Sequence, residues 1–204
     1  MTAGVRTSLT VPLRLADGWS GEARASTFDG LADRGEHLAF RLGSPSGIPL
    51  VRVHSECLTG DVFGSERCDC GPQLHESIRR IAAAGGYLLY LRQEGRGIGL
   101  YAKLDAYALQ DTGLDTYEAN LALGYGEDER DYTVAAQMLR ALGVDRVALL
   151  TNNPDKADQL ARHGVDVVER VPTGVHLTSG NARYLAAKAR HAHVLTLPIA
   201  APGG

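Results

Sequence analysis

Long apolar runs and an excess of positive charge are both missing from this chain. No segment of its 204 residues approaches the ~18 apolar residues of a membrane span, and no signal peptide opens the sequence. The formal net charge is −3, whereas proteins that bind long nucleic acids usually carry a basic surface. We therefore expect no membrane and no nucleic acid as a partner, and we expect a cytoplasmic protein.

The common phosphate-binding glycine motifs are absent as well. Neither GxGxxG nor GxxxxGK[ST] occurs in the sequence, which argues against a Rossmann or P-loop nucleotide site. Gly95, Gly97 and Gly99 form a different pattern, Gly-x-Gly-x-Gly, between an apolar segment and a helical one. Taken alone, this stretch fits a tight turn better than a ligand site.

Cysteine is scarce, and the three cysteines fall within fourteen residues, at Cys57, Cys68 and Cys70. Three thiols cannot all form disulfides within one chain, and Cys68 and Cys70 would close only a strained ring. Soft ligands at this density suit a zinc ion. Three ligands, where a structural site has four, would leave one position for water, as in a catalytic site. The alternative from spacing alone is a set of small buried residues without metal.

The hydrophobic pattern predicts an α/β fold that begins with an antiparallel β region. Four short β-prone runs separated by turns predict strands over residues 7–15, 21–27, 37–42 and 50–54. From Pro72 a helical period runs to about Gly85, and an apolar strand follows at 87–91. The next helix carries Leu100, Leu104 and Ala108 on one side.

Residues 145–170 predict a strand–helix–strand unit. The strands are expected over 146–150 and 165–168, with Asn153 as the helix N-cap, Pro154 at the first helical position and Gly164 after the last turn. The N-terminus of this helix suits a phosphate group, although a capped helix with nothing bound fits equally well. A last helix is expected at about 182–191. Overall we expect one domain over 1–204, with a β-rich part at about 7–56, an α/β part at about 57–195 and a frayed tail at 198–204.

Six stretches of the chain closely resemble the GTP cyclohydrolase II family. They occur in order over about residues 10–195, namely 52–61, 67–71, 92–96, 106–111, 128–131 and 150–156. The resemblance implies a layered sheet with flanking helices, one Zn²⁺ per chain, Mg²⁺ and a homodimer. It implies hydrolytic opening of the guanine ring of GTP with release of formate and pyrophosphate, the first step of riboflavin synthesis. The product would be 2,5-diamino-6-ribosylamino-4(3H)-pyrimidinone 5′-phosphate. We expect no fused dihydroxybutanone-phosphate synthase domain.

The resemblance also implies roles for individual residues. The zinc ligands are Cys57, Cys68 and Cys70. Asp128 matches a proton acceptor, Arg130 a residue described as a nucleophile toward the α-phosphate, and Tyr107 a tyrosine that acts beside the zinc. A guanidinium is almost always protonated, so an electrostatic clamp is the simpler role for Arg130. The positions that match the GTP-contacting set are Arg52, Val53, His54, Ser55, Glu56, Gln73, Glu94, Gly95, Arg96, Thr116, Thr151 and Lys156.

Two of these carboxylates, Glu56 and Glu94, are candidates to read the guanine edge, because adenine lacks the donor pair that a carboxylate accepts. Two rival functions remain open at this stage. A related enzyme could open the ring but retain the formyl group, although Tyr107 favours the complete reaction. A catalytically silent, zinc-stabilised nucleotide-binding module would be expected to lose Tyr107, Asp128 or Arg130, and the chain keeps all three.

Overall fold

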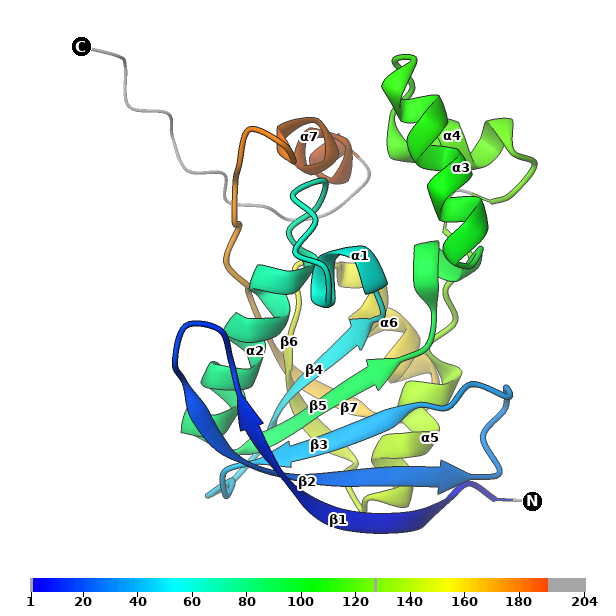
Figure 1. Ribbon diagram of the computed structural model, residues 1–204. Coiled ribbons are helices and arrows are strands. Elements are labelled where there is room, and N and C mark those ends of the chain that lie inside the picture. The colour runs from blue at the N-terminus through cyan, green and yellow to red at the C-terminus, as the bar shows by residue number, and fades with distance from the viewer. Residues whose placement is uncertain (1, 127, 191–204) are drawn as a thin grey trace.

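One mixed β-sheet organises the computed structural model, which describes residues 2–126 and 128–190 (Figure 1). Its seven strands lie in the order β1-β2-β3-β5-β4-β6-β7. This sheet with helices around it confirms the predicted α/β class. The tail expected to fray at 198–204 lies outside the described residues. The strands are β1 (Gly4–Arg14), β2 (Ser20–Asp29), β3 (Leu38–Leu42), β4 (Leu50–Ser55), β5 (Gly86–Leu91), β6 (Arg146–Leu150) and β7 (Asp166–Val171).

The first half of the sheet is antiparallel, as the alternating runs predict. Strand β1 pairs with β2, β2 with β3, and β3 with β5, with Leu9 opposite Ala25 and Ala25 opposite Phe40. Helix α2 (Cys70–Ala84) covers this half on one face, where its Ile78 and Ile81 pack with Leu88 of β5. The N-terminal strands therefore widen the sheet on one side. They contribute nothing to the region beyond the carboxyl ends of β4, β5 and β6.

The assignment of residues 50–54 to the antiparallel region is wrong. Strand β4 is present at Leu50–Ser55, but it runs parallel to both β5 and β6. The reason is the helix between β4 and β5: α2 carries the chain back along the sheet, so β5 starts again from the same end as β4. The antiparallel and parallel halves thus meet at β5 within one sheet.

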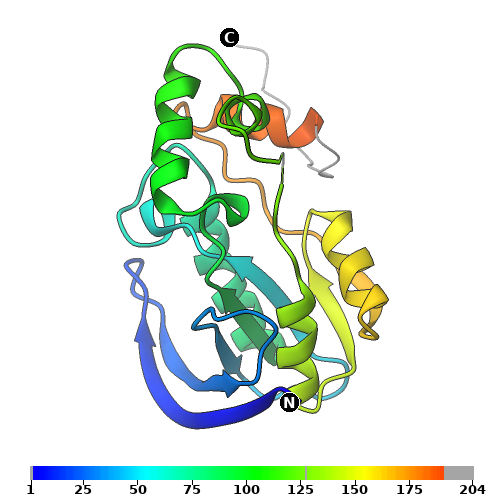
Figure 2. The ribbon, with the colours of Figure 1, turned by 90° about the vertical axis from the view of Figure 1, so that its right-hand side faces the viewer.

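The parallel strands send their connections over opposite faces of the sheet (Figures 1 and 2). After β4 the chain enters α2, whereas α5 (Thr133–Ala141) and α6 (Pro154–Arg162) pack into the other core, with Val51, Val53 and Leu149. Ligand sites in open α/β sheets lie at the carboxyl ends of strands where the connections diverge in this way. The fold therefore predicts a site beyond the ends of β4 and β6.

The strand–helix–strand unit predicted for residues 145–170 is confirmed as β6–α6–β7. Asn153 caps α6, because its side-chain oxygen accepts the backbone N–H of Asp155 at 3.0 Å, and Pro154 is the first helical residue. Gly164 follows the helix with φ +81°, a conformation that glycine adopts without strain. Strand β7 extends three residues further than predicted, to Val171.

The side of helix α3 (Leu100–Asp111) that carries Leu100, Leu104 and Ala108 is not its buried side. Leu104 is 44% exposed, and Lys103 and Ala106 are buried instead. The helix packs against α4 (Thr116–Ala122) and the short helix η1 (Glu94–Gly97) beyond the end of the sheet, so its apolar pattern has no sheet to face. Helices α1 (Leu58–Asp61) and α7 (Ala182–Arg190) lie in the same upper region (Figure 1). No helix in the described part of the chain has the length and apolar character to cross a membrane.

Candidate active site

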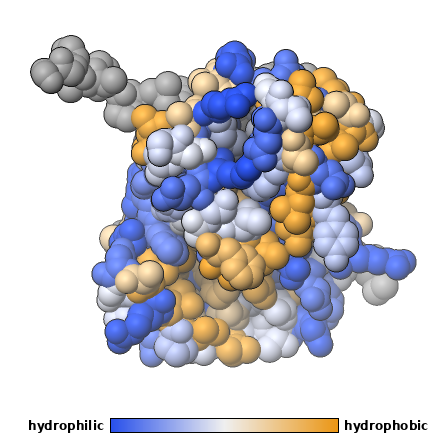
Figure 3. Space-filling model, turned by 45° about the horizontal axis from the view of Figure 1, so that its top comes forward, coloured by the Kyte–Doolittle hydropathy of each residue, from blue (hydrophilic) through white to orange (hydrophobic). Residues whose placement is uncertain are grey.

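A pocket opens beyond the carboxyl ends of β4, β5 and β6, and hydrophilic side chains gather around the hollow in this face (Figure 3). It contains about 1040 Å³ of space, part of it open to solvent. Most of the side chains that the resemblance assigns to a site line this pocket: Cys57, Cys68, Cys70, Arg52, His54, Ser55, Glu56, Gln73, Glu94, Gly95, Arg96, Tyr107, Thr116, Arg130, Thr151 and Lys156.

Two of the assigned residues do not line the pocket with their side chains. Val53 points into the core on the other side of β4, and its backbone carbonyl accepts a hydrogen bond from Lys156 Nζ at 2.8 Å. Asp128 lies behind the lining residue Arg130, with its side chain 33% exposed. Its carboxylate pairs with the Arg130 guanidinium through two hydrogen bonds, one of 2.8 Å from Nε. Asp128 therefore acts on the pocket through Arg130.

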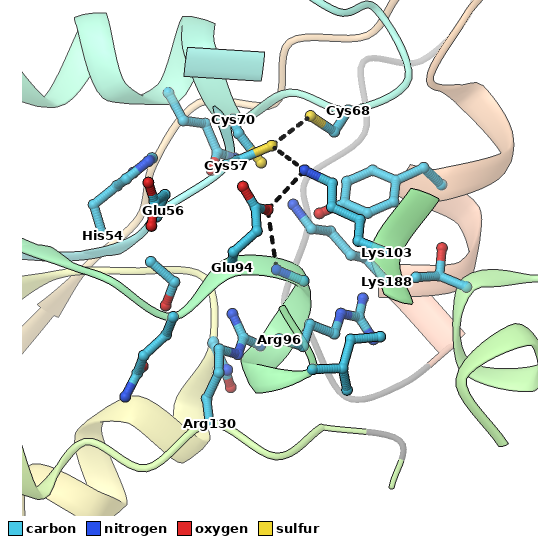
Figure 4. A pocket seen from close by; sticks show the side chains of 18 of the residues that line it. His54, Glu56, Cys57, Cys68, Cys70, Glu94, Arg96, Lys103, Arg130 and Lys188 are labelled. Carbon is cyan, nitrogen blue, oxygen red and sulfur yellow. Dashed lines mark hydrogen bonds and ion pairs between the residues drawn. The ribbon is translucent and has the colours of Figure 1, made fainter. Parts of the chain in front are cut away.

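The three cysteines converge at one side of the pocket (Figure 4). Their sulfurs lie within 4.8 Å of one another, the Cys57 and Cys68 sulfurs 3.6 Å apart, and all three are free thiols. Sulfurs bound at about 2.3 Å to one tetrahedral zinc lie roughly 3.8 Å apart, so the cluster fits this ion. A Cβ on Gly60 would lie only 2.9 Å from the Cys68 sulfur, so the adjoining turn leaves the sulfurs room only with glycine.

Buried hydrogen bonds fix the backbone that carries Cys57. The Asp61 carboxylate accepts the Cys57 N–H at 3.0 Å, a hydrogen bond from the Tyr90 hydroxyl at 2.8 Å, and one from His54 Nε2 at 3.0 Å. Burial lowers the pKa of His54, against the opposing effect of Asp61, and its ring stacks on Tyr90. This part of the cluster is therefore ordered by the protein itself.

Glu94 is enclosed within the site. Its carboxylate accepts hydrogen bonds from Lys103 Nζ at 2.8 Å, the Leu58 N–H at 2.7 Å and the Gly95 N–H at 3.0 Å. Glu56 has a different environment, because its side-chain partner among the described residues is the exposed Arg92 guanidinium, whose Nε lies 2.8 Å from Glu56 Oε2. Of the two carboxylates, Glu56 keeps more accepting capacity for a ligand.

Three cations, two of them buried and the third nearly so, lie in another part of the lining. Arg52 is 6% and Lys156 5% exposed, and the Arg130 side chain is 12% exposed. Burial, followed by the charges of Arg52 and Arg130, holds the pKa of Lys156 well below its usual value. Arg52 Nε is buried without a hydrogen-bond partner among the described residues. An anion bound here would offset the repulsion between these cations and would accept a hydrogen bond from Arg52 Nε.

Arg130 and Asp128 are held as an ion pair. Burial lowers the pKa of Arg130, but Tyr132 and Asp128 more than offset this effect, so its pKa lies above the usual value. Burial likewise raises the pKa of Asp128, and the hydrogen bond and charge of Arg130 reverse that change, leaving it below the usual value. Both groups are therefore fixed in their charged forms.

Arg96 adopts a strained backbone conformation within η1. Its φ of 61° is the single positive value among the non-glycine residues that the structure describes. The guanidinium lies over the Tyr117 ring at 3.8 Å, and the Arg96 carbonyl accepts the Glu129 N–H at 3.0 Å. Strain of this kind concentrates at functional sites, because the surrounding structure must hold it in place. Figure 4 shows Arg96 and Arg130 across the pocket from the cysteines.

Tyr107 faces the pocket from α3. Its ring lies 4.9 Å from the Arg67 guanidinium carbon and 5.6 Å from Lys103 Nζ. Burial raises the pKa of its hydroxyl, which hydrogen-bonds Thr59. Thr59 also contacts the Cys57 sulfur at 3.8 Å, so the tyrosine hydroxyl and the cluster share one neighbour.

Several lining residues escape both the sequence patterns and the resemblance. Lys103 donates to the Cys57 sulfur at 3.1 Å. Lys188 of α7 donates at 2.7 Å to Asp69, which is fully buried between Cys68 and Cys70, and Tyr184 of the same helix also lines the pocket. A signal was available in the composition, since the chain has only three lysines and all three line this pocket.

Comparison with known proteins identifies the family. The GTP cyclohydrolase II family model matches residues 9–172, most of the chain. The chain belongs to the GTP cyclohydrolase II family. This confirms the recognition made from the six stretches and makes the chain an enzyme of that family. Helix α7, with Tyr184 and Lys188, lies outside the matched part.

Two curated relatives illustrate the likeness. The chain is 56% identical over 173 residues to GTP cyclohydrolase-2 of Vibrio cholerae serotype O1, covering 83% of this chain and 87% of the relative. It is 58% identical over 160 residues to the riboflavin biosynthesis protein RibBA of Bacillus subtilis, covering 76% of this chain and 40% of that longer protein. A crystal structure of RibBX from A. baumannii, a two-domain 3,4-dihydroxy-2-butanone 4-phosphate synthase, shares 21% identity with a TM-score of 0.35 over 74% of this chain and 34% of that one.

Proposed function

We propose that this chain hydrolyses GTP, opening the imidazole ring of guanine and releasing formate and pyrophosphate. The product would be 2,5-diamino-6-ribosylamino-4(3H)-pyrimidinone 5′-phosphate, which enters riboflavin synthesis. The observation that carries the proposal is the arrangement of the pocket, where a three-sulfur cluster and a group of buried cations face one space. One end suits metal-assisted ring hydrolysis, and the other suits a triphosphate.

Cys57, Cys68 and Cys70 are proposed to hold one zinc ion. When bound, zinc would supply a Lewis acid that activates water for attack on the ring. The protein's own contribution is to keep the three sulfurs at a suitable spacing, through Gly60, and to order the Cys57 backbone through Asp61.

The buried cations are proposed to bind the triphosphate together with Mg²⁺. Phosphate oxygens would accept from Arg52 and Lys156, where the structure leaves donors and positive charge uncompensated. Thr151, which follows β6 and precedes the N-terminus of α6, lines the pocket and would lie beside the phosphates at the positive end of the helix dipole. Mg²⁺ would supply further positive charge to the triphosphate beside Arg52 and Lys156, so turnover by the zinc-loaded enzyme should stop without it. Full activity in a magnesium-free assay would remove Mg²⁺ from the proposal.

Arg130 is proposed to act as an electrostatic clamp on the leaving pyrophosphate. A nucleophilic role would require a neutral guanidinium, whereas its ion pair with Asp128 holds the proton on Arg130. The same pairing makes Asp128 a poor proton acceptor and a good anchor. A charged donor fixed in place before reaction stabilises the charge that develops on the leaving phosphates.

The guanine base is proposed to be recognised by Glu56. We expect Glu56→Gln to lower the preference for GTP over ATP, measured as the ratio of kcat/KM values, by up to ~10⁴-fold, because the amide no longer accepts the two guanine donors. Glu94→Gln provides the matched variant. Since Glu94 already accepts three internal hydrogen bonds, this substitution should reduce kcat/KM for GTP and for ATP by similar factors. An unchanged nucleotide preference in Glu56→Gln would exclude this readout.

Tyr107 is proposed to complete the reaction after the ring has opened. We expect Tyr107→Phe to accumulate a ring-opened product that retains the formyl group, because the hydroxyl beside the cysteine cluster is missing. Mass spectrometry of the products would detect it, with Tyr101→Phe as the control, since Tyr101 lies on the same helix and is 83% exposed. Wild-type product ratios in Tyr107→Phe would remove this residue from the mechanism. A formylated product from the unaltered enzyme would instead favour the rival that stops after ring opening.

We also propose that the enzyme is a homodimer. The projecting helices α3 and α4 expose large apolar side chains, with Tyr101 83% and Leu121 53% exposed. Such surfaces commonly mark protein interfaces. Sedimentation at twice the chain mass of 21.7 kDa would support the dimer, and a monomer at every concentration would contradict it.

A single domain and a cytoplasmic location complete the proposal. The sheet continues without a break from β1 to β7, which supports one domain, and limited proteolysis that leaves a stable N-terminal fragment would contradict it. The three free thiols suit a reducing compartment, which supports the cytoplasm. Recovery of the protein outside the cytoplasmic fraction of its cells would oppose that location.

A further inference from the structure

Lysine is rare in this chain and is confined to the pocket. There are three lysines against eighteen arginines, and Lys103, Lys156 and Lys188 are all buried in the pocket lining. The exposed positive charges of the described residues are therefore arginines, and a lysine differs from them in presenting a compact ammonium. Lys156 belongs to the expected GTP-contacting set. Lys103 has no role in the reaction as described so far.

The hydrogen bonds of Lys103 fully occupy its ammonium group. Nζ donates to Cys57 Sγ at 3.1 Å, to Thr59 Oγ1 at 3.0 Å and to Glu94 Oε1 at 2.8 Å. An ammonium has three N–H donors and no acceptor, so three partners satisfy it. The close view shows the nitrogen between the Cys57 sulfur and the Glu94 carboxylate (Figure 4). Lys103 is therefore directed at the cluster and has no donor left for GTP.

The three acceptors belong to different segments of the chain. Cys57 follows β4, Thr59 lies in α1, and Glu94 begins η1, while Lys103 itself comes from α3. Glu94 in turn accepts the Leu58 N–H, which closes the link back to the segment that carries Cys57. The buried ammonium of Lys103 thus connects α3 to the segments that follow β4 and β5.

The negative charges of Cys57 and Glu94 need a cation between them. Cys57 as a thiolate and Glu94 as a carboxylate would be two anions sharing a buried region, and like charges in low dielectric repel strongly. A positive group between them offsets the repulsion and fixes their spacing. The N–H bond to sulfur also withdraws electron density from the thiolate, which limits how far three thiolates reduce the Lewis acidity of a bound metal.

We propose that Lys103 is a positioning residue of the metal site, which holds the Cys57 thiolate and Glu94 in place and tunes the sulfur as a ligand. This inference rests on the proposed function, because it requires the cysteines to bind zinc. Arginine cannot replace this residue fully, since its planar fork does not direct three donors to three acceptors around one nitrogen.

The test compares Lys103→Met and Lys103→Arg with the unaltered protein and with Asp105→Asn, an exposed position on the same helix. Zinc affinity is measured by competition with a chelating dye, and each protein is also loaded with Co²⁺ to record the thiolate-to-metal absorption band. We expect Lys103→Met to bind zinc about 10- to 100-fold more weakly, as for other outer partners of metal ligands. The cobalt band should move to longer wavelength, because the sulfur loses its N–H donor.

Turnover adds a third readout. In Lys103→Met, kcat should fall while KM for GTP stays close to that of the unaltered enzyme, because the three Lys103 donors are occupied within the protein and none is left for the substrate. Lys103→Arg should give intermediate zinc affinity and an intermediate band, and Asp105→Asn should match the unaltered protein. Adding Glu94→Gln to Lys103→Met should recover part of the zinc affinity, since the unpaired carboxylate is then gone.

The outcomes separate this inference from the proposed function. If the unaltered protein binds about one zinc per chain and a folded Lys103→Met protein shows the same affinity and cobalt band, the inference is overturned and the proposed function stands. If Lys103→Met does not fold, Lys103→Arg decides by the same criteria. If the unaltered protein binds no zinc, the proposed metal site fails and the inference fails with it. Weaker zinc binding with a shifted cobalt band in the lysine variants alone is the result that supports Lys103.

Discussion

Cys68→Ser is expected to release pyrophosphate from GTP but almost no formate. The cysteine cluster and the cations Arg96 and Arg130 lie across the pocket from each other, so removal of one sulfur leaves the phosphate side intact (Figure 4). A serine hydroxyl is a poor zinc ligand beside thiolates, and formate release should fall by at least the ~100-fold loss seen when an outer partner of a metal ligand is removed. Both products are measured in one assay, by formate oxidation and by pyrophosphate detection.

Enzyme stripped of zinc by a chelator is the control for Cys68→Ser. It should show the same separation of products and regain formate release when zinc is restored, whereas the variant should not. A folded variant that releases neither product would show that the two steps cannot be separated. An unfolded variant would show that the metal maintains the fold.

Arg130→Ala is expected to slow pyrophosphate release by about 10²- to 10³-fold, the usual cost of losing a fixed donor to a developing charge. The guanidinium is held in the pocket by Asp128, and its loss also leaves that carboxylate without its partner. Steady-state rates of pyrophosphate release, measured with saturating GTP, would show the change. Arg146→Ala is the matched control, because Arg146 makes an exposed ion pair with Asp166 on β7 and should have little effect.

The clamp and the nucleophile predict different results for a trapping experiment. A nucleophilic Arg130 would form a covalent guanylyl adduct, which should accumulate in Cys68→Ser and disappear when Arg130 is also replaced. The clamp predicts no adduct in either protein. Detection of the adduct by intact-protein mass spectrometry would overturn the clamp assignment.

Local signals in the sequence account for much of the fold. Asn153, Pro154 and Gly164 define the ends of α6 locally, through a side-chain cap, a fixed φ and a positive φ, and the structure places them as predicted. The pairing of β4 depends instead on the path of α2 between distant segments, and the alternating pattern of residues 50–54 carries no information on strand direction. Helix α3 shows the same limit, since the exposure of Leu104 follows from where the helix projects.

The residues of the candidate site likewise include some that the sequence predicts and some that it does not. Cysteine spacing indicates a metal, and the resemblance supplies the positions of most lining residues. Lys103 and Lys188 were not predicted, because a lone lysine on a helix has no periodic pattern and its partner is distant in sequence: 46 residues separate Lys103 from Cys57, and 119 separate Lys188 from Asp69. Contacts of that range become visible only once α3 and α7 are placed beside the cysteine cluster.

The central claim is that this pocket converts GTP to the deformylated pyrimidinone with release of pyrophosphate. The most direct measurement is incubation of the unaltered, zinc-loaded protein with GTP and Mg²⁺, followed by mass spectrometry of the nucleotide products and assay of formate. We predict equal amounts of formate, pyrophosphate and 2,5-diamino-6-ribosylamino-4(3H)-pyrimidinone 5′-phosphate. Unchanged GTP, or a ring-opened product that retains its formyl carbon, would contradict the claim.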